Sequence, residues 1–164
     1  MHIMKVTRNL QITAKEFFDA IFEELVQEIE KLDHQKISKE SLKTGFHYHH
    51  KGKDAYSNID FEIVEYEEEK IYNSVRTSFN GTTSIRYEVS SIENGITVTF
   101  THESNEHRSQ KKQPKIISMF TEAYELGRMT DKLYSYQKKV INEKEGFEEK
   151  DFGSPLLPNI RKKK

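Results

Sequence analysis

The chain has 164 residues, of which 32% are charged and 34% are hydrophobic, as expected of one globular domain of ordinary size. Its 26 basic and 27 acidic residues nearly cancel, so no overall charge would draw the chain to nucleic acid or to an anionic membrane. Because cysteine is absent, disulfides, thiol nucleophiles and thiolate metal sites are excluded. No apolar run reaches the roughly 18 residues of a membrane span, and no signal peptide is recognisable, so we expect a cytoplasmic protein.

The N-terminal part of the chain predicts one strand followed by a long amphipathic helix. Apolar residues alternate over 4–12, which indicates a half-buried strand. Thr13 and Glu16 have the spacing of a capping box that starts a helix. Apolar residues then recur every three or four positions to about Leu32, and this stripe must be buried. A second, short helix is predicted over 38–43.

The period of the apolar residues changes to two after the short helix, which predicts an antiparallel meander. Five strands fit this stretch, at 46–50, 58–66, 70–79, 83–92 and 96–103. Because opposed residues in adjacent strands must share a face, the turns decide the register. A type I′ turn at 94–95 would oppose Tyr87 to His102. A three-residue loop at 80–82 would oppose Val75 to Tyr87, which keeps apolar residues together better than a two-residue turn does.

A similar loop at 67–69 would oppose Phe61 to Val75. Together these pairs predict two rows across one sheet face: Phe61, Val75, Tyr87 and His102 in one row, and Ile63, Asn73, Val89 and Phe100 in the other. This mostly apolar face is expected to pack against a long C-terminal helix, which begins at Pro114 and ends at about Glu143. The helical spacing of apolar residues ends before 144–164, where we expect a charged, flexible tail.

The order of elements resembles the helix-grip fold of the START-like superfamily, also called SRPBCC, over residues 4–143. More narrowly, three segments resemble a small bacterial family known as a domain of unknown function: Met4-Lys5-Val6-Thr7-Arg8-Asn9-Leu10, Thr13-Ala14-Lys15-Glu16-Phe17-Phe18 and Leu42-Lys43-Thr44-Gly45-Phe46. The resemblance implies an α+β fold, in which a curved antiparallel sheet of about six strands grips the C-terminal helix. These motifs are structural and carry no catalytic signature, so they imply a fold without an activity.

The resemblance also implies a cavity between sheet and C-terminal helix for an apolar or amphipathic ligand. Its walls would come from the predicted inner face and from the helix: Phe61, Ile63, Asn73, Val75, Thr77, Tyr87, Val89, Phe100, His102, Phe120, Tyr124 and Gly127. The alternative is that these side chains fill the space. The small residues Ala123 and Gly127 would either admit a ligand or let helix and sheet approach closely.

Two groups of polar residues are candidates for chemistry. Tyr87 opposite His102 would orient a ligand or move a proton, although a hydrogen-bonded core pair is the simpler interpretation. His47 and His49 share one side of a strand, as two metal ligands would. We expect both to face solvent, with no third ligand identifiable, and therefore predict no metal site.

These observations favour a non-enzymatic protein that binds a small apolar or amphipathic ligand without a cofactor. Nucleophile-elbow, Walker A, dinucleotide-binding and zinc-protease signatures are absent from the sequence. One alternative is an interaction module or homodimer that docks through the sheet back, the end of the C-terminal helix or the tail. Another is a small cyclase- or hydrolase-type enzyme that uses Tyr87 and His102. Nucleic-acid binding is not expected, because the basic segments 108–115 and 161–164 lack interleaved aromatic residues.

Overall fold

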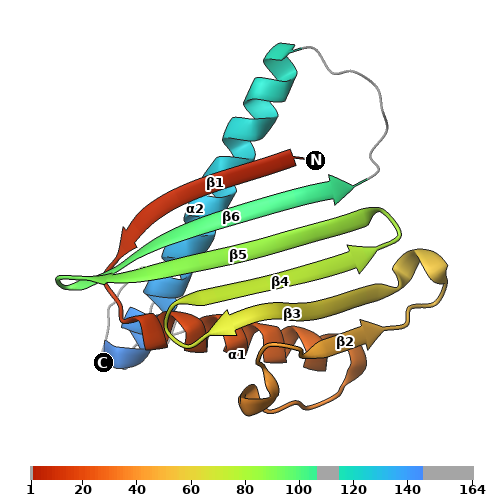
Figure 1. The fold of residues 1–164 in the computed structure, drawn as a ribbon, viewed down its shortest axis with the longest axis horizontal. Helices are drawn as coiled ribbons and strands as arrows, with labels where there is room; N and C mark the ends of the chain where they lie inside the picture. Colours follow the sequence, from red (N-terminus) through yellow and green to blue (C-terminus); the bar gives the residue numbers. More distant parts are fainter. Residues whose placement is uncertain (1, 107–114, 146–164) are drawn as a thin grey trace, which may run out of the picture.

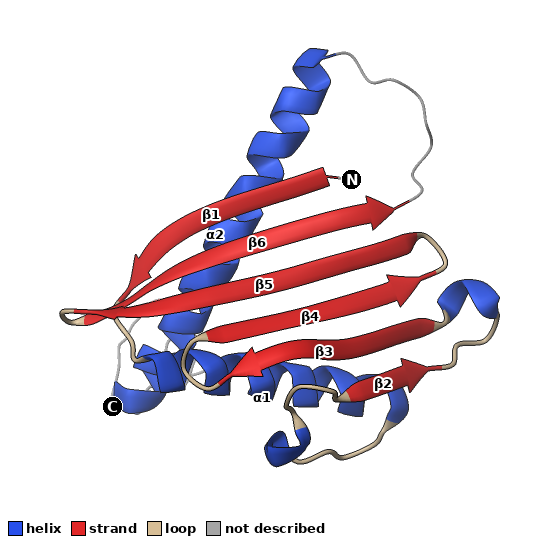
Figure 2. Cartoon of the chain, viewed as in Figure 1, coloured by secondary structure: helices blue, strands red, loops and turns tan. Residues whose placement is uncertain are grey.

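The computed structural model describes residues 2–106 and 115–145. In these residues, six strands form one curved antiparallel sheet in the spatial order β1-β6-β5-β4-β3-β2, and two long helices cover one of its faces (Figure 1). The strands are β1 (His2–Leu10), β2 (His47–His50), β3 (Ile59–Glu67), β4 (Ile71–Ser78), β5 (Gly81–Ile92) and β6 (Gly95–Glu106). The helices are α1 (Ala14–Asp33) and α2 (Lys115–Glu145). This arrangement confirms the predicted α+β fold (Figure 2).

Helix α1 begins at the predicted capping box. The Glu16 backbone N–H donates to the Thr13 hydroxyl at 3.1 Å, and the Thr13 backbone N–H donates to the Glu16 carboxylate at 2.9 Å. The helix ends at Asp33, and His34 follows in the left-handed conformation at φ 54°. The predicted short helix over 38–43 is a single 3-10 turn at Lys39–Ser41.

The turn between β4 and β5 differs from the predicted loop at 80–82 and reverses the faces of β4. Ser78 pairs with Gly81, so the turn contains only Phe79 and Asn80. The inner face of β4 therefore carries Tyr72, Ser74 and Arg76, whereas the predicted inner residues Asn73, Val75 and Thr77 lie on the outer face. The prediction was wrong because it kept Phe79 in the strand. In the structure that ring is exposed in the turn and packs edge-on against Tyr56.

Strand β3 contains a bulge at Val64, where the register shifts between Ile63 and Glu65. The extra residue lets Ile63 and Tyr66 reach the same face, and such bulges increase the local twist and bend of a strand. The predicted pairing of Phe61 with Val75 was wrong, because Phe61 opposes Arg76. The sheet therefore bends at a position that strict two-residue alternation does not reveal.

The turn between β5 and β6 is displaced by one residue from its predicted position. It contains Glu93 and Asn94, and only Asn94 has a positive φ, at 66°, so the turn is not type I′. The resulting register differs by two residues from the prediction, which preserves the faces of both strands. The predicted Tyr87–His102 pair was nevertheless wrong, because Tyr87 opposes Phe100 and His102 opposes Ile85.

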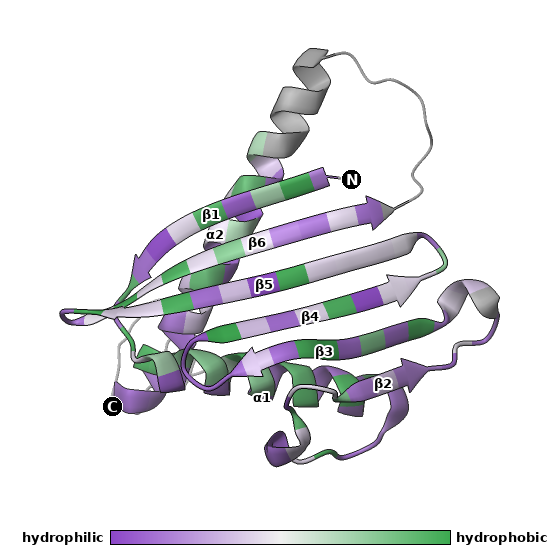
Figure 3. Cartoon of the chain, in the orientation of Figure 1, coloured by the Kyte–Doolittle hydropathy of each residue, from purple (hydrophilic) through white to green (hydrophobic). Residues whose placement is uncertain are grey.

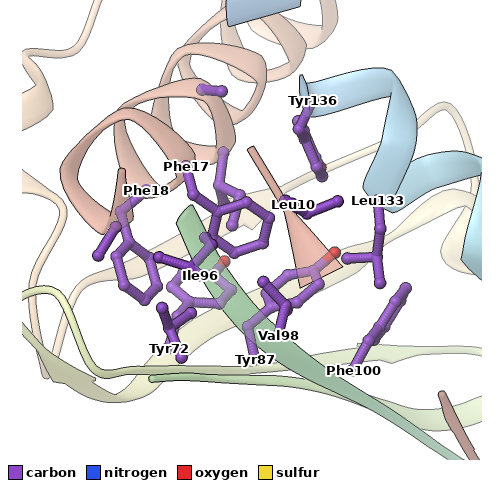
Figure 4. Packing of buried hydrophobic residues seen from close by; sticks show 14 of the residues in the cluster. Leu10, Phe17, Phe18, Tyr72, Tyr87, Ile96, Val98, Phe100, Leu133 and Tyr136 are labelled. Carbon is purple, nitrogen blue, oxygen red and sulfur yellow. The ribbon is translucent and has the colours of Figure 1, made fainter. Parts of the chain in front are cut away.

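The core lies between the inner sheet face and the two helices. Apolar and polar residues alternate along much of the sheet (Figure 3), and α2 buries Met129, Leu133, Tyr136 and Val140. Phe17 of α1 is fully buried, and its ring meets the rings of Tyr87 and Tyr136 at centroid distances of 5.4 and 5.7 Å (Figure 4). One phenylalanine thus joins α1, the sheet and α2. Neither long helix, within its described residues, has the length and apolar character of a membrane span.

Candidate functional site

A cavity of about 670 Å³ lies between the inner sheet face, α1 and α2. Small-molecule sites typically have volumes of roughly 300–1,000 Å³. Residues of both helices and of five strands line it.

The deep part of the cavity is aromatic. Tyr72, Tyr87 and Phe100 are almost fully buried and come from three adjacent strands. The Tyr87 ring lies 4.6 Å from that of Phe100 and 6.0 Å from that of Tyr72, measured between centroids. Met4 and Ile21 add aliphatic surface from β1 and α1. This floor suits the apolar body of a ligand, because binding would remove apolar surface from water.

Hydrogen bonds join residues of α1 and α2 at the edge of the cavity. Lys132 donates to Glu24 at 2.9 Å, and the Tyr136 hydroxyl donates to the same carboxylate oxygen at 3.0 Å. The Tyr87 side chain lies close to that of Tyr136. Burial raises the pKa of both tyrosines far above the ordinary value. Both hydroxyls are therefore protonated at neutral pH.

The mouth of the cavity carries charged side chains. Glu28 of α1 and Arg76 of β4 lie 3.9 Å apart, at the outer limit of an ion pair. Arg128 of α2 is exposed there, and Glu125 lies 3.9 Å from His2 of β1. Polar and apolar groups are thus separated along the depth of the cavity, as an amphipathic ligand requires.

The structure brings together some of the predicted cavity residues and separates others. Phe61, Tyr87, Phe100 and His102 line the cavity. Ile63 and Val89 are buried in the core outside it, and Asn73, Val75 and Thr77 lie on the outer sheet face. Tyr124 is 68% exposed, and a Cβ atom at Gly127 would meet nothing within 4 Å. The side chain of Phe120 lies outside the described residues.

A family model supports the narrower of the two resemblances. The model is described as Domain of unknown function (DUF3284), and it matches residues 4–122. The chain belongs to this family. A search of the curated proteins found no match to the DUF3284 chain.

Solved structures share the fold of this DUF3284 protein at low sequence identity. Protein MLL2253 from Mesorhizobium loti is 12% identical, with a TM-score of 0.53 over 87% of this chain and 98% of that chain. Protein BH1534 from Bacillus halodurans is 11% identical, with a TM-score of 0.53 over 85% and 96%. DynU16, from the dynemicin biosynthetic locus, is 10% identical, with a TM-score of 0.51 over 85% and 47%. These likenesses concern the fold alone.

Sequence reasoning missed the contribution of α1 to the cavity of the DUF3284 chain. Ile21, Glu24, Leu25 and Glu28 line it from this helix. Their spacings of three and four residues place them on one side of α1, and this pattern is visible in the sequence. The missing information was that α1 lies across the same sheet face as α2.

The histidine-rich strand β2 has the predicted orientation. Phe46 and Tyr48 pack against the core, while the side chains of His47 and His49 are 57% and 47% exposed. Both imidazoles approach one oxygen of Asp60, at 3.6 and 2.7 Å. In the part of the DUF3284 chain that the structure describes, no group of His, Cys, Asp and Glu side chains is arranged to hold a metal ion.

Proposed function

We propose that this DUF3284 protein binds a small amphipathic molecule in the cavity between the sheet, α1 and α2. The observation that carries the proposal is the cavity itself, which combines a volume of about 670 Å³ with an aromatic floor and a charged mouth. Pockets that are mostly apolar and contain a few placed polar groups are typical of ligand sites. The resemblance to the START-like superfamily supports the same location, between the sheet and the C-terminal helix.

The polar groups of the cavity favour binding over proton transfer. Tyr87 and Tyr136 stay protonated at neutral pH because burial disfavours their anions. A general base near neutral pH needs a pKa close to the operating pH. The buried phenols are therefore poor bases, and their hydroxyls serve as fixed hydrogen-bonding groups. The alternative hypothesis, an enzyme that uses Tyr87 and His102, assumed that these two residues are directly opposed in adjacent strands, and they are not.

Binding can be tested with phenylnaphthylamine, a neutral probe that fluoresces in apolar surroundings. We expect saturable binding by the full chain and at least about tenfold weaker binding by Ile85→Trp, whose indole would occupy the cavity. Thr77→Trp adds the same side chain to the outer face of β4 and should bind like the wild type. Circular dichroism and thermal unfolding would verify that both variants are folded. The proposal fails if the wild type does not bind, or if Ile85→Trp binds equally well.

A further inference from the structure

A ladder of ion pairs joins α1 to α2 and stops where the cavity opens. Its pairs are Glu16–Lys144 at 2.8 Å, Glu23–Lys139 at 3.2 Å and Glu24–Lys132 at 2.9 Å. Glu28 lies one turn beyond Glu24 on α1, and Arg128 lies one turn before Lys132 on α2. Glu28 and Arg128 therefore occupy the positions at which the next ion pair between α1 and α2 would form. Glu28 contacts Arg76 of β4 instead.

Arg128 is a charged residue of the mouth that has no ion-pair partner among the described residues. It is exposed, it lines the cavity, and it makes no hydrogen bond or ion pair with any other residue that the structure describes. Two other acids that line the cavity are occupied. Glu24 accepts from Lys132 and Tyr136, and Glu125 is directed toward His2 at the β1 edge.

The charged residues that line the cavity balance in number: Arg76, Arg128 and Lys132 against Glu24, Glu28 and Glu125. Lys132 is paired with Glu24 at 2.9 Å, whereas Arg128 has no partner among the described residues and the Arg76–Glu28 contact is long, at 3.9 Å between exposed side chains. The two arginines are therefore the cations of the cavity that are most available to a ligand. A guanidinium presents several N–H donors in a planar fork, which matches the oxygens of a carboxylate, sulfonate or phosphate. A head group held at the mouth would also keep its contact with water, so its charge would not be buried.

We propose that Arg128 and Arg76 select an anionic head group, so that the ligand is an anionic amphiphile whose apolar body occupies the aromatic floor. This inference rests on the proposed function, because it specifies the ligand class of the same cavity. A cationic head group would meet the repulsion of both arginines. A neutral head group could accept hydrogen bonds from them but would lack the attraction between opposite charges.

Two probes that differ by one sulfonate group test the inference. Anilinonaphthalene sulfonate is phenylnaphthylamine with an added sulfonate group, and both can be titrated by fluorescence against the full chain. We expect the sulfonate to bind about fivefold more tightly, the upper end for an exposed ion pair, with an advantage that declines at high salt. Arg128→Gln and Arg76→Gln should each weaken binding of the sulfonate and leave binding of the neutral probe unchanged.

Two further variants are added: one should strengthen binding of the sulfonate, and the other is a control outside the cavity. Glu28→Gln removes the acid that competes for Arg76 and should tighten sulfonate binding, again without affecting the neutral probe. Arg8→Gln removes a positive charge from β1 outside the cavity and should change neither affinity. Equal affinity for the two probes, or a preference that survives both cavity-arginine substitutions, overturns the anionic selection while the binding proposal stands. Failure of both probes to bind overturns both proposals.

Discussion

At the scale of single residues, Asp33 shows how one side chain joins two elements. It lies in the last turn of α1, where the helix dipole disfavours a negative charge. The Tyr48 hydroxyl donates to one carboxylate oxygen, and the His50 ring nitrogen lies 2.8 Å from the other. The hydrogen bond from Tyr48 is the main reason that the pKa of Asp33 is lowered, and His50 contributes further. Burial, together with Asp33, raises the pKa of Tyr48 to about 12. These contacts hold β2 against the end of α1.

This arrangement predicts a pH dependence that Asp33→Asn should reduce. The pKa of Asp33 is lower in the folded state than its ordinary value of 3.8, so its carboxylate stabilises the fold above that pH. The contribution is lost as the pH falls through the folded-state pKa. We therefore expect the free energy of unfolding, measured with urea at a series of pH values below about 4, to fall more steeply for the wild type than for Asp33→Asn. Parallel pH profiles would show that Asp33 contributes nothing.

At the scale of elements, α2 presents a narrower buried face than its sequence predicts. Met129, Leu133, Tyr136 and Val140 are buried, whereas Gly127, which the sequence favours as a cavity or close-approach position, is exposed. No atom would contact a Cβ atom at this position. The glycine therefore has no packing role among the described residues, and it costs the helix backbone entropy.

Gly127→Ala should consequently stabilise the protein. Alanine has a higher helix propensity and restricts the unfolded chain, so we expect the free energy of unfolding to rise by about 0.5–1 kcal/mol. Leu133→Ala, at a fully buried position of the same helix, should lower it by about 2–5 kcal/mol. Urea denaturation of the two variants beside the wild type measures both changes. A destabilised Gly127→Ala would instead indicate that the helix does approach the sheet closely there.

Strand β4 shows why sequence patterns predict where a strand lies better than they predict which face of the sheet each of its side chains occupies. Apolar side chains occur on both sides of this strand, with Tyr72 on the inner face and Ile71 and Val75 on the outer. Alternation alone therefore gives no unique answer, and the face depends on which residues form the following turn. In β5 and β6 a two-residue error in register leaves every side chain on its correct face, so the inward positions of Tyr87 and Phe100 were predictable.

At the scale of the whole molecule, Glu24 connects the two helices above the sheet. Its carboxylate accepts hydrogen bonds from Lys132 and from the buried hydroxyl of Tyr136, while Phe17 fills the space beneath. Lys132 also lies over the Tyr136 ring, 5.4 Å from its centroid. The contact between α1 and α2 is thus polar near the cavity and aromatic in the core.

Removal of this carboxylate should destabilise the fold through Tyr136. In Glu24→Ala the buried hydroxyl loses its acceptor, which we expect to lower the free energy of unfolding by about 1–3 kcal/mol. Adding Tyr136→Phe removes the hydroxyl as well, so the double variant should be less destabilised than the sum of the two single variants. A double-mutant cycle in urea measures this coupling. Strict additivity would mean that the hydrogen bond at 3.0 Å has no energetic effect.

The sequence by itself determined the order of elements, the start of α1 at Thr13 and the alternating character of the meander. These features depend on side chains only a few residues apart, whose spacing can be read directly. The tertiary structure decided the faces of β4 and the walls of the cavity. The mouth and edge of the cavity depend on ion pairs such as that between Glu24 and Lys132, which are 108 positions apart in the sequence. No local pattern records such a pair, because it exists only when both helices lie across the same bent sheet.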